Sequence, residues 1–482
     1  MRFFLCLTLW LLSTFPCSAH LAVNQDFLSL LPEGTRSGLV IQKLGDAQPI
    51  LQQQTGAYFP PASTLKIVTA LASQLELGNE FYFETQLRSD QQDLALIFSG
   101  DPTLTSRHLK TLLLGYKQRH GQHIRGNIWL DARHFTGYQR AVGWPWDSLG
   151  VCYSAPISAI NLDGNCIQAS IYTQDDGTTR VYVPPHYPVY VRSDARSVTQ
   201  TQQQAQHCDL ELIASRDNHY HLSGCLTQRN QPLPLQFAVQ DTELYTQRVI
   251  YQLLNQLGMT LDGEVKLGAP KSQNWSLVAS HRSEFLPQLL TKMLQDSDNL
   301  IADALLKTLG QTFFQQPGSF NNGSEALKQI IFTRTGIDIN DAQIVDGSGL
   351  SRNNRVRLKS MRQILNYLWQ HDNELHLIDA LPSAGENGTL LYRRSMQDGK
   401  IRGRLKAKSG SLYSTHNMVG FSLDNKGQPQ ALFIQWITDY FPAKPAPKKP
   451  VDTPITQFER HFYQVILSTH HSPNIATKTK AQ

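Results

Sequence analysis

Beyond its first residues, the chain has no long run of apolar side chains. No stretch after residue 19 approaches the ~20 apolar residues that a membrane-spanning helix needs. Charged residues make up only 17% of the 482 residues, and the formal net charge is +5. Lys and Arg are not clustered, so the sequence lacks the basic patch that nucleic-acid binding needs. We therefore expect a soluble globular protein with no transmembrane segment and no nucleic-acid partner.

The first 19 residues have the pattern of a secretory signal peptide. One basic residue, Arg2, precedes an apolar run that is too short to span a membrane. The small residues Cys17 and Ala19 then stand where a signal peptidase cleaves. We expect this segment to be removed on export; a retained membrane anchor is the alternative.

Cysteine is scarce as well, with six in the chain, and two of them lie in the signal segment. The four that remain are Cys152, Cys166, Cys208 and Cys225. Their spacings of fourteen and seventeen residues match no compact zinc-ligand pattern, so we expect no metal site and no cofactor. An even number of cysteines in an exported chain favours disulfides, and pairing of neighbours closes the shortest loops. The predicted bonds are Cys152–Cys166 and Cys208–Cys225.

The pattern of apolar residues predicts several elements outside the middle of the chain. An alternating run at residues 38–44 predicts a β-hairpin, and a largely apolar helix is expected from Ser63 to Leu77. Further helices are expected near residues 285–294, 299–307 and 358–369. A β-meander is expected at 404–437, and a final helix at 454–468.

The sequence pattern in the middle of the chain differs from that of both ends. Short β-like runs alternate there with Gly, Pro, Asn and Asp turns, which predicts a mostly β insertion, with two subdomains favoured over one. The expected division is a signal peptide at 1–19, a catalytic domain formed by 20–88 and 268–470, the insertion at 89–267, and a flexible tail at 471–482.

Three short motifs carry the chemistry, and they lie far apart in the sequence. They are Ser63-Thr-Leu-Lys66, Ser297-Asp-Asn299 and Lys408-Ser-Gly410, in that order. Each motif alone is a weak signal, because such short patterns occur by chance. All three in this order, each in a suitable local context, strongly indicate an acyl-transfer site.

Ser63 and Lys66 are expected on one face of a helix, at its start. The helix N-terminus presents backbone N–H groups that favour an oxyanion beside the serine. Burial of Lys66 among apolar residues should lower its pKa and make the neutral amine available as a base. We predict that Ser63 is the nucleophile and Lys66 its proton acceptor. Without the other motifs, a helix cap and a surface lysine would be the better interpretation.

The second motif lies between two predicted helices. Ser297 and Asn299 are two residues apart, so in an extended turn both can face one cleft while Asp298 points away. Ser297 is predicted to relay a proton to a leaving amine, and Asn299 to bind the peptide of the substrate. A helix cap is the structural alternative, and Asp298 fits that role at the same time.

The third motif lies on the first strand of the C-terminal meander. Lys408 and Ser409 offer a cation and a hydroxyl donor to a substrate carboxylate, and Gly410 allows the backbone to approach the ligand. The backbone N–H of Ser411 is predicted to act beside that of Ser63 as the second oxyanion donor.

Six segments together resemble one known family. They are PASTLK at 61–66, SGDPTL at 99–104, GWPW at 143–146, YSAP at 153–156, DNLIAD at 298–303 and DGSGLS at 346–351. The chain is similar to the class C low-molecular-mass penicillin-binding proteins, which are periplasmic D-alanyl-D-alanine carboxypeptidase/endopeptidases. Ser409 departs from the pattern, because the third motif usually has threonine there.

The resemblance implies an α/β protein with the penicilloyl-serine transferase fold, also called serine β-lactamase-like. A five-stranded antiparallel sheet flanked by helices would stand beside an all-helical subdomain, with the site between them. The implied activity is removal of the terminal D-alanine from pentapeptide stems of peptidoglycan and hydrolysis of D-alanyl cross-links, through an acyl-serine. β-Lactams would be covalent inhibitors, and the location would be the periplasm, with peripheral membrane association left open.

Two other functions share these motifs. A serine β-lactamase needs extra machinery for deacylation, commonly a Glu-x-x-x-Asn element between the second and third motifs, and none occurs between Asn299 and Lys408. A β-lactam-binding sensor or scaffold would acylate once and stop, which the complete proton-transfer set disfavours. The sequence leaves open the balance of carboxypeptidase to endopeptidase activity, the oligomeric state and the role of the insertion.

Overall fold

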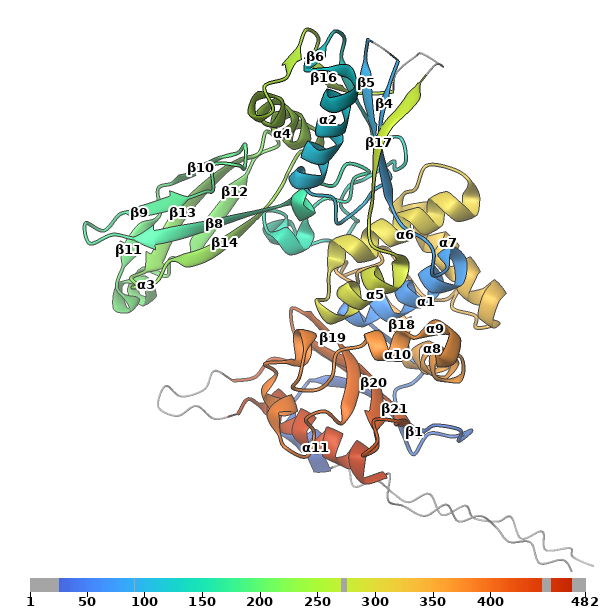
Figure 1. The fold of residues 1–482 in the computed structure, drawn as a ribbon. Coiled ribbons are helices and arrows are strands. Elements are labelled where there is room, and N and C mark those ends of the chain that lie inside the picture. Colours follow the sequence, from blue (N-terminus) through green and yellow to red (C-terminus); the bar gives the residue numbers. More distant parts are fainter. Residues whose placement is uncertain (1–25, 91, 270–274, 444–451, 470–482) are drawn as a thin grey trace, which may run out of the picture.

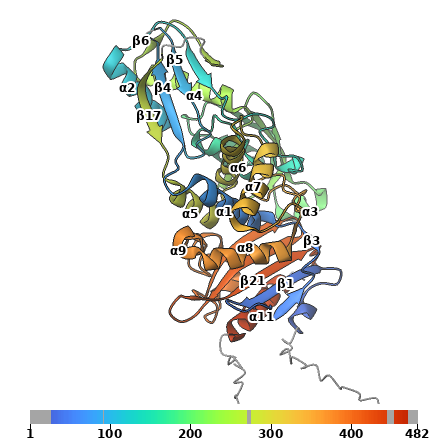
Figure 2. The same ribbon diagram turned by 90° about the vertical axis from the view of Figure 1, so that its right-hand side faces the viewer.

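The computed structural model describes residues 26–90, 92–269, 275–443 and 452–469. The predicted signal peptide and the predicted tail lie outside these residues. Figures 1 and 2 show an elongated molecule in which a sheet, a layer of helices and a second sheet follow one another. A β-rich arm projects beside the second sheet (Figure 1). Within the described ranges no helix is long and apolar enough to cross a membrane.

The first sheet joins the two ends of the chain. Its strands lie in the order β19-β20-β21-β1-β2, and all neighbouring pairs are antiparallel. Val40 lies opposite Ile434 where the N-terminal hairpin meets the C-terminal meander. The bounds are β1 Arg36–Lys43, β2 Leu51–Gln53, β19 Leu405–Leu412, β20 Thr415–Leu423 and β21 Pro429–Thr438. The predicted five-stranded antiparallel sheet is confirmed.

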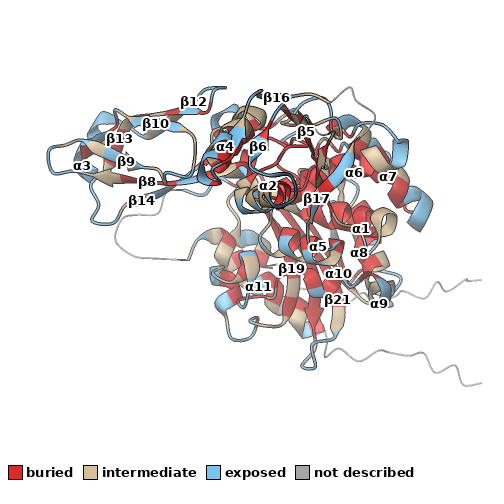
Figure 3. Ribbon diagram, turned by 45° about the horizontal axis from the view of Figure 1, so that its top comes forward, coloured by how far each residue is buried: buried red, intermediate tan, exposed pale blue. Residues whose placement is uncertain are grey.

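Alternate side chains of this sheet enter two different cores, because successive residues of a strand point to opposite faces. Val40 and Ile434 pack in the core of the helical layer, whereas Leu39 and Phe433 pack with the final helix. Helix α8 (Leu358–Gln370) contacts the sheet on the first face, and α11 (Pro454–Ser468) contacts it on the second. Figure 3 shows the sheet and the adjoining helices as mostly buried.

Four helices form the layer above the sheet. They are α1 Lys66–Leu77, α5 Leu286–Gln295, α6 Asn299–Phe314 and α7 Phe320–Thr335. The sequence analysis misses α7, because asparagines and a glycine in its first turns lower its helix propensity. Ser319 caps its start by accepting from the backbone N–H of Asn322, and Gly336 ends it at φ +72°.

A second five-stranded sheet forms the base of the insertion. Its order is β16-β7-β5-β4-β17, with β4 Glu84–Ser89, β5 Leu94–Ile97, β7 Ile128–Asp131, β16 Val265–Leu267 and β17 Ser276–Arg282. Two fifteen-residue helices, α2 (Ser106–His120) and α4 (Thr242–Gln256), pack against it. The base of the insertion is therefore α/β, while strand residues outnumber helical residues over the insertion as a whole, in line with the expected mostly β segment.

Strands β4 and β17 extend beyond the expected insertion of residues 89–267. They pair with each other antiparallel, with Ser276 opposite Ser89 and Arg282 opposite Glu84. This pairing makes the two ends of the segment part of one sheet with β5 and β7. We therefore propose residues 84–282 as the bounds of the insertion.

The arm consists of two small sheets. One has the order β14-β8-β9, with β8 Cys166–Thr173, β9 Thr179–Tyr182 and β14 Leu233–Ala238. The other has the order β10-β13-β11, with β12 paired to β13. Their bounds are β10 Tyr190–Ser193, β11 Arg196–Val198, β12 Leu210–Ala214 and β13 His219–Thr227. The short helix α3 (Gln200–Gln206) connects β11 to β12.

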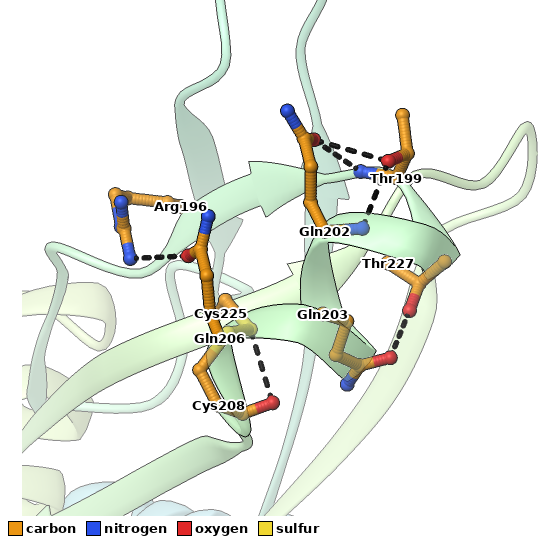
Figure 4. Close-up of a disulfide and its surroundings, with 8 residues drawn as sticks. All are labelled: Arg196, Thr199, Gln202, Gln203, Gln206, Cys208, Cys225 and Thr227. Atoms are coloured by element: carbon orange, nitrogen blue, oxygen red, sulfur yellow. Dashed lines mark hydrogen bonds between the residues drawn. A yellow bond between two sulfur atoms is a disulfide. The ribbon is translucent and has the colours of Figure 1, made fainter.

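Both predicted disulfides are confirmed. Cys152 is joined to Cys166 at the start of β8, and Cys208 is joined to Cys225 in β13. Figure 4 shows the second bond beside α3, where Gln203 accepts a hydrogen bond from Thr227. Each bond ties a loop to a strand of the insertion, and neither lies in the catalytic sheet.

Several short elements complete the described chain. Two-residue strands pair β3 Tyr58–Phe59 with β18 Val356–Arg357, and β6 His123–Ile124 with β15 Thr260–Leu261. The remaining helices are α9 Asp372–Leu375, α10 Leu377–Ala380 and seven 3₁₀ helices: η1 Asp26–Leu30, η2 Ala62–Leu65, η3 Trp146–Ser148, η4 Cys152–Ser154, η5 Asp163–Asn165, η6 Gly388–Leu390 and η7 Arg394–Gln397.

Replacing Cys208 and Cys225 together by alanine should destabilise the arm by ~3 kcal/mol, because the bond closes a loop of seventeen residues. Amide hydrogen exchange followed by mass spectrometry should show faster exchange in β12 and β13 and unchanged protection in β19–β21. Replacing Cys152 and Cys166 together is the matched comparison, with its effect at the base of the arm. Unchanged exchange in β12 and β13 of the first variant would contradict the prediction.

Candidate active site

Residues of the first two motifs and Ser411, which directly follows the third motif, line one cavity of about 330 Å³ between the helical layer and the edge strand β19. Ser63, Ser297, Asn299 and Ser411 line it, from three different segments of the chain. The other lining residues are Pro145, Tyr153, Gly349, Leu350, Arg352, Leu412 and Tyr413. The structure thus brings together residues that are up to 348 positions apart, as the motif analysis requires.

Ser63 lies in η2, immediately before α1, and its turn is fixed from several sides. Asn417 of β20 donates to the carbonyl oxygens of Pro60 (2.8 Å) and Pro61 (3.0 Å). Gly410 approaches so closely that a Cβ there would lie 3.0 Å from the backbone nitrogen of Ser63. The backbone that presents the serine is therefore held by the sheet itself.

Lys66 is fully buried, and its Nζ has three acceptors. They are Oγ of Ser63 at 3.1 Å, Oδ1 of Asn299 at 2.6 Å and the carbonyl oxygen of Ser348 at 2.7 Å. Burial lowers the pKa of Lys66 to about 8, although the nearby charge of Asp303 acts to raise it. An appreciable share of molecules therefore holds a neutral amine at neutral to slightly alkaline pH, and that amine can accept the proton of Ser63.

Asp303 of α6 is a site residue that the sequence analysis did not select. Its Oδ1 accepts from the backbone N–H of Gly347 (2.7 Å) and of Ser348 (2.9 Å), which aims the Ser348 carbonyl at Lys66. Burial, helped by the charge of Asp346, raises the pKa of Asp303 to about 8. The sequence signal was an aspartate in the apolar run 300–306, where an acid needs a specific partner.

The second motif joins α5 to α6 as expected. Asp298 caps α6 by accepting from the backbone N–H of Ile301 at 3.0 Å. Ser297 has φ +59°, so the turn is left-handed rather than extended, and the expected backbone geometry is wrong. Both Ser297 and Asn299 nevertheless line the cavity. The side-chain amide of Asn299 links Lys66 to Tyr153. Its Oδ1 accepts from Lys66 Nζ, and its Nδ2 donates to the carbonyl oxygen of Tyr153 at 2.7 Å.

Lys408 is the second fully buried lysine of the site. Its Nζ donates to Oγ of Ser297 and to the carbonyl oxygen of Ser409, each at 2.9 Å. Burial lowers the pKa of Lys408 well below its usual range, and the nearby charges of Lys66 and Arg393 act in the same direction. A bound carboxylate would favour the ammonium form, so this position suits an anionic group of a ligand.

Alternate backbone N–H groups of β19 point away from its neighbour β20. Ala407 donates its N–H to the carbonyl of Pro382, on the side of β19 away from β20. N–H groups alternate in direction along a strand, so that of Ser411 also points away from β20. Because Ser411 lines the cavity with Ser63, the two backbone donors are available to one oxyanion.

A serine and a buried lysine at a helix start, beside a second buried lysine on an edge strand, define an active-site-serine acyl-transfer centre on the penicilloyl-serine transferase fold. The sequence profile of the D-Ala-D-Ala carboxypeptidase 3 (S13) family matches residues 23–460. The chain belongs to this family. Within the described ranges, no group of three or more His, Cys, Asp or Glu is placed to hold a metal ion.

Curated relatives and solved structures agree with this family. The chain is 34% identical to D-alanyl-D-alanine carboxypeptidase DacB of Haemophilus influenzae, over 93% of this chain and 94% of that protein. It is 26% identical to a D-alanyl-D-alanine carboxypeptidase of an Actinomadura species, over 82% and 77% of the two chains. The crystal structure of H. influenzae penicillin-binding protein 4 superposes with a TM-score of 0.83 at 33% identity, covering 91% of this chain and 98% of that one. The same protein complexed with a β-lactam gives a TM-score of 0.79.

The environment of Lys66 gives a direct pH prediction. In protein labelled with ¹³C-lysine, the Cε resonance of Lys66 should titrate with a midpoint near pH 8, because burial disfavours the ammonium. Asp303→Asn removes a negative charge that raises this pKa, so its midpoint should move to lower pH. Lys66→Met identifies the resonance. A midpoint unchanged by Asp303→Asn, in a variant that keeps its thermal stability, would contradict the coupling.

Proposed function

We propose that this protein is a serine D,D-peptidase acting on peptidoglycan. It removes the terminal D-alanine from pentapeptide stems and hydrolyses D-alanyl cross-links through an acyl-serine intermediate. The observation that carries the proposal is the contact of Lys66 Nζ with Ser63 Oγ at 3.1 Å, next to a cavity whose other wall holds Ser297, the partner of the buried Lys408. The relatives that match nearly the whole chain are named as carboxypeptidases of the same bond type.

Acylation begins when the neutral amine of Lys66 takes the proton of Ser63. The Ser63 Oγ then forms a bond to the carbonyl carbon of the scissile peptide, and the carbonyl oxygen becomes an oxyanion between the backbone N–H groups of Ser63 and Ser411. The C–N bond breaks as Ser297 relays the proton that Lys66 took from Ser63 to the leaving amine, which returns Lys66 to its neutral form. Lys66 then takes a proton from water as the water oxygen bonds to the acyl carbon, and it gives this proton to Ser63 Oγ when the ester bond breaks.

Substrate recognition follows from the charge of the site. The scissile bond of D-alanyl-D-alanine stands next to a free α-carboxylate, and Lys408 with the hydroxyl of Ser409 provides a cation and a donor for it. Asn299 holds the acyl-side peptide from the opposite wall. A D-alanyl cross-link to the D-centre of a diamino acid has the same carboxylate, so one clamp serves both reactions.

The same arrangement explains reaction with β-lactams. A β-lactam carries a carboxylate near its strained amide, so it fits the Lys408 clamp while Ser63 opens the ring. A solved relative, penicillin-binding protein 4 of H. influenzae, forms a complex with a β-lactam. We propose that acylation of Ser63 inhibits this enzyme and that the enzyme works in the periplasm, where its peptidoglycan substrate lies.

Ser63→Ala should keep the fold and eliminate covalent labelling by fluorescent penicillin, because it removes the hydroxyl that Lys66 deprotonates and that forms the acyl bond. D-Alanine release from a pentapeptide should fall to background. Circular dichroism and the melting temperature serve as the folding control, since Ser63 is a small residue on a preformed turn. An acyl group mapped by peptide analysis to another serine of the native enzyme would contradict the assignment.

Lys408→Ala should impair carboxypeptidase and endopeptidase activity by a similar factor, because the same charge-assisted contact is lost in both. A loss of kcat/KM of about 10²-fold is expected for a buried charged partner. The matched control is Lys406→Ala, two residues earlier on β19, where the lysine pairs with Asp379 outside the cavity. D-Alanine release from a pentapeptide and cleavage of cross-linked dimers should be measured together. Loss of only one activity would refute a shared clamp.

A further inference from the structure

The hydroxyl of Ser409 needs an external partner to define its direction. Serine lacks the β-branch that restricts χ1 of threonine, so its side chain has more freedom at this position. A hydroxyl has a single proton, and binding of a carboxylate requires that this proton point at the ligand. Lys408 Nζ does not supply this constraint, because it donates to the backbone oxygen of Ser409 rather than to its Oγ.

A second hydroxyl lies next to Ser409. The Oγ1 of Thr389 is 2.9 Å from the Oγ of Ser409. Thr389 itself is exposed, while Ser409 is 9% exposed. If Thr389 donates its proton to Ser409, the Ser409 proton is left for a ligand and cannot turn back toward Thr389.

The loop that carries Thr389 is held against β19 on one side and against the end of α5 on the other. On one side it runs along β19, where Ala384 donates its N–H to the carbonyl of Leu405 at 2.9 Å. On the other side Gly388 has φ +51°, and a Cβ there would lie 2.6 Å from the carbonyl oxygen of Gln295. Gln295 ends α5, two residues before Ser297. The loop is therefore held between the end of α5, which leads into the second motif, and β19, which carries the third motif. These contacts fix the position of Thr389.

We propose that Thr389 is a positioning residue that orients the hydroxyl of Ser409 toward the substrate carboxylate. The inference rests on the proposed D,D-peptidase function, since it assigns a further residue to its clamp. Thr389 acts through Ser409, so its contribution is to binding of the carboxylate rather than to the proton transfers at Ser63. The effect should therefore appear in KM more than in kcat, and only for ligands that carry the carboxylate.

The test compares two acylated tripeptides ending in D-Ala-D-Ala, one with a free carboxylate and one with a terminal carboxamide. Thr389→Val keeps the side-chain volume and removes the hydroxyl. It should raise KM for the carboxylate substrate about 3–10-fold, the usual worth of one oriented hydrogen bond, and leave the carboxamide substrate unchanged. Thr389→Ser should behave as the native enzyme. Thr333→Val on the exposed face of α7 is the matched control.

A rescue variant separates positioning from general damage. Adding Ser409→Thr to Thr389→Val restores a β-branched residue whose own rotamer directs the hydroxyl, so KM should return toward the native value. Equal loss on both substrates, no loss on either, or failure of the rescue would each overturn the role of Thr389. Failure of the clamp itself is recognised separately, because Ser409→Ala and Lys408→Ala would then leave the carboxylate substrate unaffected.

Discussion

The burial of two lysine side chains beside one cavity is the constraint on which the rest of the site depends. Lys66 and Lys408 are each 0% exposed, and an unpaired charge in such a place costs several kcal/mol. Each Nζ therefore keeps its acceptors, three for Lys66 and two for Lys408. Burial also lowers both pKa values, so one lysine can act as a base while the other favours a ligand that brings a negative charge.

One helix supplies both a direct and an indirect partner of Lys66. Asn299 and Asp303 are four residues apart on α6, so they share a face of the helix. Asn299 touches the lysine directly, while Asp303 reaches it through the loop that ends in the Ser348 carbonyl. Gly349 makes this arrangement feasible, because a Cβ there would lie 1.9 Å from the carbonyl oxygen of the residue before Ser63. The helix cap, the glycine loop and the nucleophile thus form one packed unit.

The sequence predicts the catalytic residues of this site better than the residues that hold them in position. Ser63, Lys66 and Lys408 could be selected because each residue type has a chemical reason to stand in its motif. The role of Ser348 could not be predicted, since its backbone carbonyl contacts a lysine 282 residues earlier in the chain. Helix α7 and the boundary strands of the insertion were missed for the same kind of reason. Tertiary packing outweighs the weak local propensity of residues 320–323, and strand pairing across the insertion has no local signal.

The insertion takes part in the site through the segment between β7 and β8, and its arm stands apart. Trp144 donates its Nε1 proton to Asp346 at 2.8 Å, and Tyr153 accepts from Asn299 through its carbonyl oxygen. The neighbouring Cys152 is bonded to Cys166 at the start of β8, so the wall segment and the arm share a covalent anchor. Figure 1 shows the arm extending away from the catalytic sheet. The wall of the cavity on this side is therefore a short segment braced by the disulfide, and the strands of the arm contribute no lining residue.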